Sequence, residues 1–401
     1  MAEKKYRVLT LDGGGPWAVL QPMAMQGLFG AETRGHDVLK LFDLVAANGG
    51  GTVALAGLAM NLTLKEIIGR LFVDGPNRKT IFGPTKAGWL KAASQIRLEA
   101  LRSLFDTHHK HTLGALFKQV ETSVGYCPDL LVCAFDCDRR RPEFFRSNPR
   151  SDSASSTGSW DPTLAEVLQA SVTSPIHNFD ALAKIEGARF CDGAPAGLFN
   201  PIVAAITEAR ANRRAPDAIQ VLSLGSGTLQ VPHPEGKGAT SEKSKVSSSP
   251  AEIQRSIFED PPDSQTYVAH VLLGQELPTA VNPPPFGAGS VVRMNPVIRV
   301  SLETSKELAR HGIARPDFDT LAQLERGKLG QDQIRLISRF GTLWMNDHVE
   351  NEPIRCNRNF KCEIGHERYS LARDHWCRLT GHKLPQPGPT PPPGTPQTTA
   401  A

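Results

Sequence analysis

Apolar segments with the spacing of strands alternate with segments of helical spacing over the first 230 residues of the chain. Residues 6–11, 42–46, 130–135 and 219–224 are apolar or alternating runs, and such runs predict strands. Residues 19–29 repeat apolar positions at the interval of a helix, and similar patterns separate most of the strands. This alternation predicts an α/β protein whose mostly parallel sheet is covered by helices on both faces.

The composition changes further along the chain. We expect residues 1–230 to form the core, and residues 231–263, which are rich in Ser, Lys, Glu and Pro, to form a flexible insertion. Residues 264–383 carry mixed helical patterns and are expected to form a C-terminal helical cap or the remainder of the core. Residues 384–401 contain seven prolines and no apolar periodicity, which predicts a disordered tail.

The first predicted strand runs into a glycine-rich turn that contains Asp12, Gly13, Gly14 and Gly15. Such a turn can be a simple strand-to-helix connection. A dinucleotide-binding loop is disfavoured, because Asp12 would face the pyrophosphate and Pro16 lacks an amide donor. A run of glycines also lets backbone amides converge on one point, as in an oxyanion hole for acyl transfer. The turn alone leaves these interpretations open.

The second predicted strand ends in the segment AANGGG, which has the strand–turn–helix form of a nucleophile elbow. In a serine hydrolase the elbow reads Gly-x-Ser-x-Gly, and here the serine position is occupied by Gly49, which has no side chain to attack a substrate. The flanking elbow residues are Ala47, Asn48, Gly50 and Gly51. Because the two glycine turns follow successive strands, we expect them to meet at the carboxyl edge of one sheet.

A third candidate element is the triplet Asp192, Gly193 and Ala194, which follows a short apolar stretch. A lone Asp-Gly is usually a turn, but beside an elbow Asp192 is a candidate general base for the proton of a serine hydroxyl. A histidine-containing triad is the alternative. It is less favoured, because the elbow of ordinary α/β-hydrolases follows several strands rather than two. The histidines available to it are His233, His270, His311 and His348.

In this order and spacing, the three elements resemble the patatin-like phospholipase family of lipid acyl hydrolases. The segments LLVCAFDCDRRRPEFFRSN, EVLQASVTSPIHNFD and VLSLGSGT are similar to further parts of that family, so the resemblance covers roughly residues 6–230. It implies a three-layer α/β/α sandwich and a Ser–Asp dyad at the positions of Gly49 and Asp192. It also implies an oxyanion hole formed by the amides of Gly13, Gly14 and Gly15, no cofactor, and hydrolysis of ester bonds in membrane phospholipids or other acyl lipids.

The sequence departs from the family's pattern within these elements. Trp17 and Ala18 replace the usual Arg-Gly after the glycine run, and Ala47 replaces the first glycine of the elbow. Gly49 removes the reacting atom, and Thr52 is not placed to replace it. We therefore expect the chain to be inactive as written and interpret it as an inactivated variant of an active enzyme. The alternatives are a natural pseudoenzyme that binds lipid or a partner without turnover, and a nucleotide-regulated effector that degrades membranes.

Charge and cysteine content limit which binding partners and which cellular compartment we expect for the chain. The net charge of +4 is spread without a long basic block, which disfavours nucleic acid as the main partner and suits peripheral contact with an anionic membrane. No apolar run has the length of a membrane span or a secretory signal, and the seven cysteines lack a framework spacing, so we expect a cytoplasmic protein. A metal site is not expected, because the spacing of the most suggestive cluster fits no zinc pattern. That cluster consists of Cys356, Cys362, His366, His375 and Cys377.

Overall fold

A computed structural model describes most of the chain. The described residues are 5–86, 92–105, 112–147, 161–174, 182–230, 262–274, 290–322, 330–355 and 363–385. Nearly all of the expected insertion at 231–263 and of the expected tail at 384–401 lies outside these ranges.

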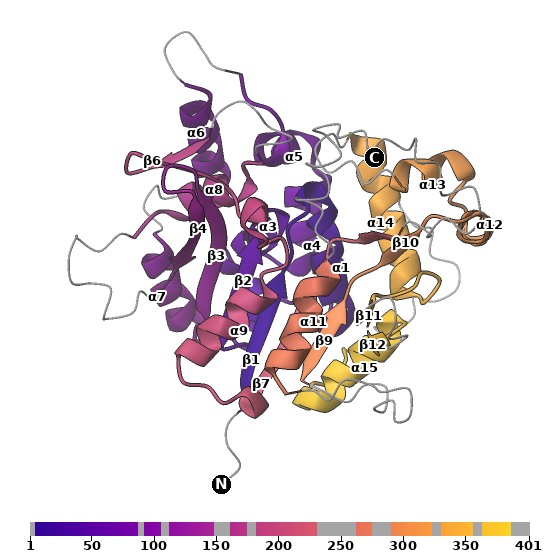
Figure 1. Cartoon of the computed structure of the whole chain (residues 1–401). Coiled ribbons are helices and arrows are strands. Elements are labelled where there is room, and N and C mark those ends of the chain that lie inside the picture. The colour runs from indigo at the N-terminus through magenta and orange to yellow at the C-terminus, as the bar shows by residue number, and fades with distance from the viewer. Residues whose placement is uncertain are drawn as a thin grey trace, which may run out of the picture.

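The centre of the molecule is an eight-stranded, mostly parallel sheet (Figure 1). Its strands are β1 (Tyr6–Leu11), β2 (Leu44–Asn48), β3 (Asp129–Asp136), β4 (Arg141–Arg146), β5 (Ala183–Ile185), β6 (Ala188–Asp192), β7 (Ile219–Leu224) and β9 (Val291–Met294). The strand order is β5-β6-β3-β2-β1-β7-β9, with β4 also paired to β3. Strands β3, β2, β1, β7 and β9 run parallel, whereas β4, β5 and β6 form antiparallel pairs. The predicted α/β class with a mostly parallel sheet is confirmed.

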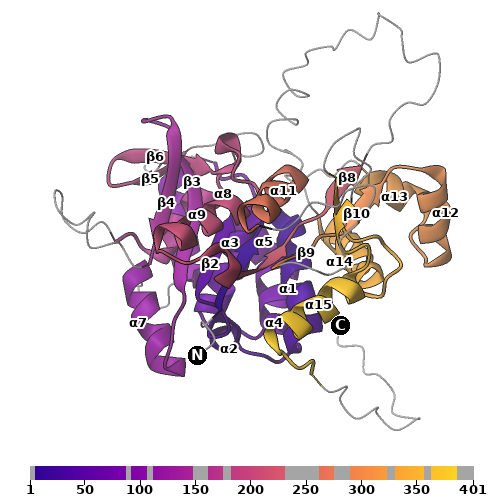
Figure 2. The same cartoon turned by 60° about the horizontal axis from the view of Figure 1, so that its bottom comes forward.

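Helices cover both faces of this sheet, which gives three layers (Figures 1 and 2). One face packs against α9 (Ile202–Ala211) and α11 (Pro262–Leu272), through a core cluster that includes Tyr6 and Val8 of β1. The other face carries the larger core cluster. The helices that contribute to it include η1 (Gly15–Val19), α1 (Leu20–Phe29), α2 (Gly35–Leu39), α3 (Gly50–Ala59), α4 (Leu64–Glu66), η2 (Ile67–Val73), α5 (Gly75–Phe82), α6 (Ala93–Phe105), α7 (Leu113–Val124), α8 (Leu164–Val172), α12 (Leu302–Arg310), α13 (Arg315–Leu321), α14 (Gln331–Met345) and α15 (Tyr369–Thr380).

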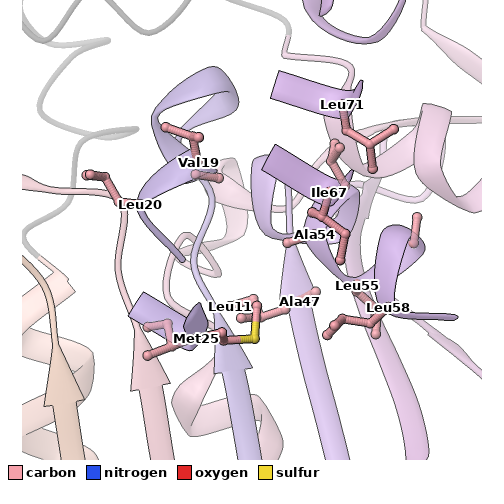
Figure 3. Close-up of a cluster of buried hydrophobic side chains, with 14 of the residues drawn as sticks. Leu11, Val19, Leu20, Met25, Ala47, Ala54, Leu55, Leu58, Ile67 and Leu71 are labelled. Atoms are coloured by element: carbon pink, nitrogen blue, oxygen red, sulfur yellow. The ribbon is translucent and has the colours of Figure 1, made fainter. Parts of the chain in front are cut away.

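Helix α3, which follows the predicted elbow, is enclosed by other elements. Every residue of α3 is buried, and its Ala54 and Leu55 pack in the cluster drawn in Figure 3, together with Leu11 of β1 and Ile67 of η2. A Cβ on Gly57 would come within 2.7 Å of Ile67 Cγ1, so α3 and η2 pack at close range. The apolar surface buried around α3 therefore fixes the helix that begins at the elbow.

The C-terminal part of the chain contributes directly to the central sheet. β9 pairs in parallel with β7, with Val221 opposite Val291. Trp376 of α15 stacks on Phe42, which lies just before β2, with the ring centroids 5.8 Å apart. Two small sheets complete the described strands: β8 (Thr228–Gln230) pairs with β10 (Val297–Arg299), and β11 (Pro353–Arg355) pairs with β12 (Glu363–Gly365). In the described parts of the chain, no helix combines the length and the apolar character that crossing a bilayer requires.

Candidate active site

The turn between β2 and α3 has the backbone shape of a nucleophile elbow. β2 ends at Asn48, α3 begins at Gly50, and Gly49 between them has φ 49° and ψ −121°. This conformation lies outside the regions that side-chain-bearing residues ordinarily occupy, and glycine adopts it without steric cost. A Cβ on Gly50 would overlap the carbonyl oxygen of Gly15, so α3 meets the glycine-rich loop at the level of the backbone. The two glycine turns therefore meet at one edge of the sheet, as expected from the sequence.

The side chain that Gly49 lacks would point at Asp192. An ideal Cβ built on Gly49 lies 3.0 Å from Oδ2 of Asp192 and 3.3 Å from Cα of Gly13. A side chain here would therefore stand between the carboxylate and the glycine-rich loop. An approach of 3.0 Å is tighter than most Cβ contacts in proteins, so Asp192 would have to withdraw by a few tenths of an ångström to admit one.

Asp192 reaches the elbow because β2 and β6 pair with consecutive residues of β3. Asn48 pairs with Cys133, and Asp192 pairs with Ala134. The buried side chain of Asn48 then joins the two turns: its Nδ2 donates to Asp192 Oδ1 over 2.9 Å, and its Oδ1 accepts the N–H of Gly193 over 3.1 Å. Asn48 therefore fixes the orientation of the aspartate relative to the elbow.

The turn after β6 supports the same carboxylate oxygen. The backbone N–H of Ala194 donates to Asp192 Oδ1 over 2.8 Å. Oδ1 thus accepts from both Asn48 and Ala194, whereas Oδ2 is the oxygen nearest to Gly49. A carboxylate held in this way presents one oxygen to the position of the missing side chain, as a general base requires.

Ser171 of α8 holds the elbow in place through its hydroxyl group. The N–H of Gly49 donates to Ser171 Oγ over 2.9 Å, and Ser171 Oγ donates to the carbonyl oxygen of Cys133 over 2.9 Å. Thr52 Oγ1 lies 2.9 Å from the same Oγ. Because both buried hydroxyls are engaged in holding the turn, neither Ser171 nor Thr52 is oriented to replace the missing nucleophile.

The glycine-rich loop after β1 supplies fewer amide donors than the sequence suggested. Gly14 and Gly15 have φ values of 110° and 55°, and the loop leads directly into η1. The N–H of Gly13 donates to the carbonyl oxygen of Phe199 over 2.8 Å, so it is not available to donate to an oxyanion. Gly14 and Gly15, whose amides have no acceptor within the described residues, remain as candidate donors for an oxyanion hole.

A buried ion network next to the glycine-rich loop was not predicted from the sequence. Arg293 of β9 donates to both oxygens of Asp12, over 3.0 and 2.6 Å, and its Nε donates to Glu352 Oε2 over 3.2 Å. The exposed fractions of the Arg293, Asp12 and Glu352 side chains are 0, 0 and 4 %. Burial lowers the pKa of Arg293, but the attraction of the two carboxylates outweighs burial and raises it above the usual value. The feature of the sequence that could have indicated this network is an arginine inside the otherwise apolar strand VVRM.

The histidines of the alternative triad occupy other parts of the structure. His233 lies outside the described residues. The rings of His311 and His348 are packed together, with their centroids 3.9 Å apart. His270 lies on α11, and burial together with neighbouring histidines, His270 among them, lowers the pKa of His366 to about 3. These contacts involve the C-terminal elements rather than the elbow.

The cysteine and histidine cluster near the C-terminus is described only in part. Cys356 and Cys362 lie outside the described residues. His375 Nδ1 and His366 Nε2 are hydrogen-bonded to each other over 3.0 Å, and Cys377 is half-buried. Within the described residues, no three His, Cys, Asp or Glu side chains form a group that could hold a metal ion.

Comparisons with known proteins give likenesses of structure but no match of sequence. No protein-family model and no curated protein match the sequence. Twelve chains of known structure match the fold, among them the crystal structure of VipD from Legionella pneumophila. That match has a TM-score of 0.38 and 11% sequence identity, and it covers 84% of this chain and 67% of VipD. A likeness of this size leaves the function to be argued from the site itself.

Proposed function

We propose that the site is that of a lipid acyl hydrolase of the patatin-like kind, built for a Ser–Asp dyad and silenced because glycine occupies the nucleophile position. The observation that carries the proposal is the direction of the missing side chain. A Cβ at Gly49 would lie 3.0 Å from Asp192 Oδ2, at the tip of a strand–turn–helix elbow. Nucleophile and base need this proximity for proton transfer.

A serine at position 49 would complete an acyl-transfer site. Its hydroxyl would give its proton to Asp192 Oδ2 while its oxygen attacks the ester carbonyl. The ester C–O bond would then break, and the alcohol would leave with the proton that Asp192 returns. The amides of Gly14 and Gly15 would stabilise the oxyanion that forms, and a water molecule would then release the acid. Among the residues that the structure describes, Asp192 and Gly13 lie nearest to the Cβ position of Gly49, and neither is a nucleophile. Acyl transfer would therefore stop before the first bond forms.

The substrate class in this proposal is the acyl ester of a membrane lipid. It rests on the resemblance of the ordered glycine-rich loop, elbow and Asp192 turn to patatin-like enzymes. The mild positive charge of the chain, +4, suits work at an anionic lipid surface, where substrate is concentrated.

The experiment is a comparison of Gly49→Ser with Gly49→Ala. Both variants add a Cβ with the same backbone strain, and only the serine adds a hydroxyl. We expect Gly49→Ser to hydrolyse a nitrophenyl ester and to release fatty acid from phospholipid vesicles, whereas the unaltered chain and Gly49→Ala remain at background. Folding of each variant is checked by circular dichroism and thermal unfolding.

A second variant tests the base. Adding Asp192→Asn to Gly49→Ser keeps the size and the hydrogen-bonding shape of the side chain but removes the proton acceptor. Activity should fall by about a hundredfold or more, in line with general-base catalysis. A well-folded Gly49→Ser protein that is inert on esters, phospholipids and lysophospholipids overturns the hydrolase proposal. Full activity in the double variant overturns the dyad and turns the search to a histidine.

A second candidate function is lipid binding without turnover. The observation that favours it is the short approach between Asp192 Oδ2 and the Cβ position of Gly49, because the carboxylate occupies part of the space that a side chain would need. A protein of this kind would bind fatty acids or lysolipids, and Gly49→Ser would bind them without cleaving an ester.

A further inference from the structure

Two cysteine side chains meet directly beside the candidate general base. Cys191 is the residue before Asp192 in β6, and Cys137 is the residue after the end of β3. Their sulfur atoms lie 3.4 Å apart. The contact follows from the antiparallel register, in which Phe135 lies opposite Cys191, so that Cys137 falls two residues further along on the same face.

The strand ends that carry the two thiols are tied together by several hydrogen bonds. The N–H of Cys137 donates to the carbonyl oxygen of Arg189 over 2.8 Å. Asp138 accepts the backbone N–H of Arg189 over 2.8 Å and its Nε over 2.7 Å. These bonds hold the end of β3 to β6 at the level of Cys137.

The pair differs from the other described cysteines. Cys127 donates to a backbone carbonyl, Cys133 is fully enclosed in β3, and Cys377 lies half-buried on α15. Among the described residues, Cys137 and Cys191 are the only two cysteines whose sulfur atoms lie within hydrogen-bond distance of each other. Cys191 is buried, whereas Cys137 is half-buried and can be reached from solvent.

We propose that Cys137 and Cys191 form a reversible disulfide by exchange with a small-molecule disulfide such as glutathione disulfide. The Cys137 thiolate attacks one sulfur of the reagent, which breaks the reagent's S–S bond and releases one thiol. Cys191 then loses its proton and attacks the sulfur of Cys137, and the second thiol leaves. Two cysteine thiols are thereby oxidised, and one molecule of reagent disulfide is reduced to two thiols.

The surroundings of the pair set the order and the rate of these steps. Burial raises the pKa of the Cys137 thiol, and its hydrogen bond with Cys191 opposes this rise. Burial and the contact with Cys137 both raise the pKa of Cys191. Cys137 is the more exposed of the two, so a reagent in solution reaches it first, which makes it the attacking group. Exchange depends on the thiolate, so its rate rises with pH.

Disulfide formation requires the two sulfur atoms to move from 3.4 Å to about 2.05 Å. The strand ends must shift to allow this, and a strained disulfide is easily reduced again. Asp192 follows Cys191 directly, and its Oδ1 is held by Asn48 and by the N–H of Ala194. We therefore expect the disulfide to displace the carboxylate from its position at Gly49. This consequence rests on the proposed function, whereas the disulfide itself does not.

The site is tested on the full chain with glutathione disulfide at mildly alkaline pH, followed by peptide mapping without reduction. We expect one cross-linked peptide pair that joins Cys137 to Cys191 and disappears after treatment with dithiothreitol. Cys191→Ser should stop the reaction at a glutathione adduct on Cys137, and Cys377→Ala, the control, should leave the cross-link intact. Absence of the cross-link in folded protein, or pairing of Cys191 with Cys133 instead, overturns the assignment.

The coupling to the base is tested in the Gly49→Ser background. Oxidation should lower kcat/KM by about tenfold to a hundredfold, the effect of a misplaced catalytic group, and reduction should restore it. The Cys137→Ala form of that variant should not respond. If the cross-link forms and kcat/KM is unchanged, the coupling is wrong. If Gly49→Ser is inactive, the hydrolase proposal fails, while peptide mapping still decides whether the disulfide forms.

Discussion

Replacement of Arg293 by methionine would remove the only cation of the buried network that borders the glycine-rich loop, as far as the described residues show. The methionine side chain fills much of the same volume but donates no hydrogen bond. Asp12 would lose the two bonds that Arg293 donates to its carboxylate oxygens, over 3.0 and 2.6 Å. Glu352 would lose the bond over 3.2 Å and keep those from Asn295 and Thr228. Two carboxylates would then remain in a region with side-chain exposures of 0 and 4 %.

The loss of stability expected for Arg293→Met follows from the two buried carboxylates that remain without the guanidinium. Removing one partner of a buried ion pair typically costs about 3–5 kcal/mol, because the remaining charge is no longer compensated. Arg293 compensates two carboxylates, so we expect a loss of about 4 kcal/mol or more in the free energy of unfolding. Since domains are stable by roughly 5–15 kcal/mol, Arg293→Met should be folded but markedly less stable.

Urea unfolding measures this loss, and Arg299→Met is the matched control. Arg299 of β10 pairs with Glu350 over 2.8 Å, but the two side chains are 41 and 57 % exposed. An ion pair of this kind contributes about 0–1 kcal/mol. The two variants should therefore differ by several kcal/mol.

The combination of Arg293→Met with Glu352→Gln should recover part of the lost stability, because it removes one of the uncompensated charges. The reasoning is refuted if the two arginine variants lose the same free energy of unfolding to within about 1 kcal/mol. Equal losses would mean that the buried carboxylates do not depend on the guanidinium of Arg293.

Backbone strain, buried histidines and lipid binding give three further expected results. Gly49→Ala should lower the free energy of unfolding by about 1–3 kcal/mol in urea, whereas Gly69→Ala, where a Cβ meets nothing within 4 Å, should not; equal effects would contradict strain at the elbow. Burial lowers the pKa of His366 to about 3 and of His375 to about 4, so both stay neutral in the fold while histidines of the unfolded chain protonate below about pH 6.5. Stability should therefore fall as the pH drops from about 6.5 towards 4, and a double change of both histidines to glutamine should flatten the dependence of Tm on pH. Fatty acid below its micellar concentration should raise the Tm, and no shift at saturation would count against an acyl site.

The central strands of the sheet were predictable from the sequence because each is an apolar or alternating run. β1 and β7 span the predicted residues, and each run ends at a polar or glycine residue, Asp12 and Gly225 respectively. The second strand was predicted at 42–46 and lies at Leu44–Asn48. The shift arises because Asn48, a polar residue that looks like part of a turn, pairs with Cys133 in the sheet.

The contacts that hold the candidate site were not predictable in the same way. Arg293 and Asp12 are 281 residues apart, and a charged residue in a short strand ordinarily indicates an exposed position. The roles of Asn48 and Ser171 depend on which residues of β3 face β2 and β6, and register of this kind is set by long-range pairing. Sequence patterns place the chemical groups at the edge of the sheet. They do not tell which of these groups already have hydrogen-bond partners in the fold, as the N–H of Gly13 has in the carbonyl oxygen of Phe199.

In the proposed site, glycine at position 49 lacks the reacting group, while the contacts that would position this group are present. The elbow is fixed by the bond from the N–H of Gly49 to Ser171, and Asp192 is fixed by Asn48, and neither contact involves a side chain at position 49. Restoring a side chain therefore costs strain at one residue, about 1–3 kcal/mol, and a shift of Asp192 by a few tenths of an ångström. This is a fraction of the roughly 5–15 kcal/mol by which a domain is stable. We therefore expect the Gly49→Ser variant to fold. Its hydrolytic activity then measures the chemistry of the site and not a loss of folded protein.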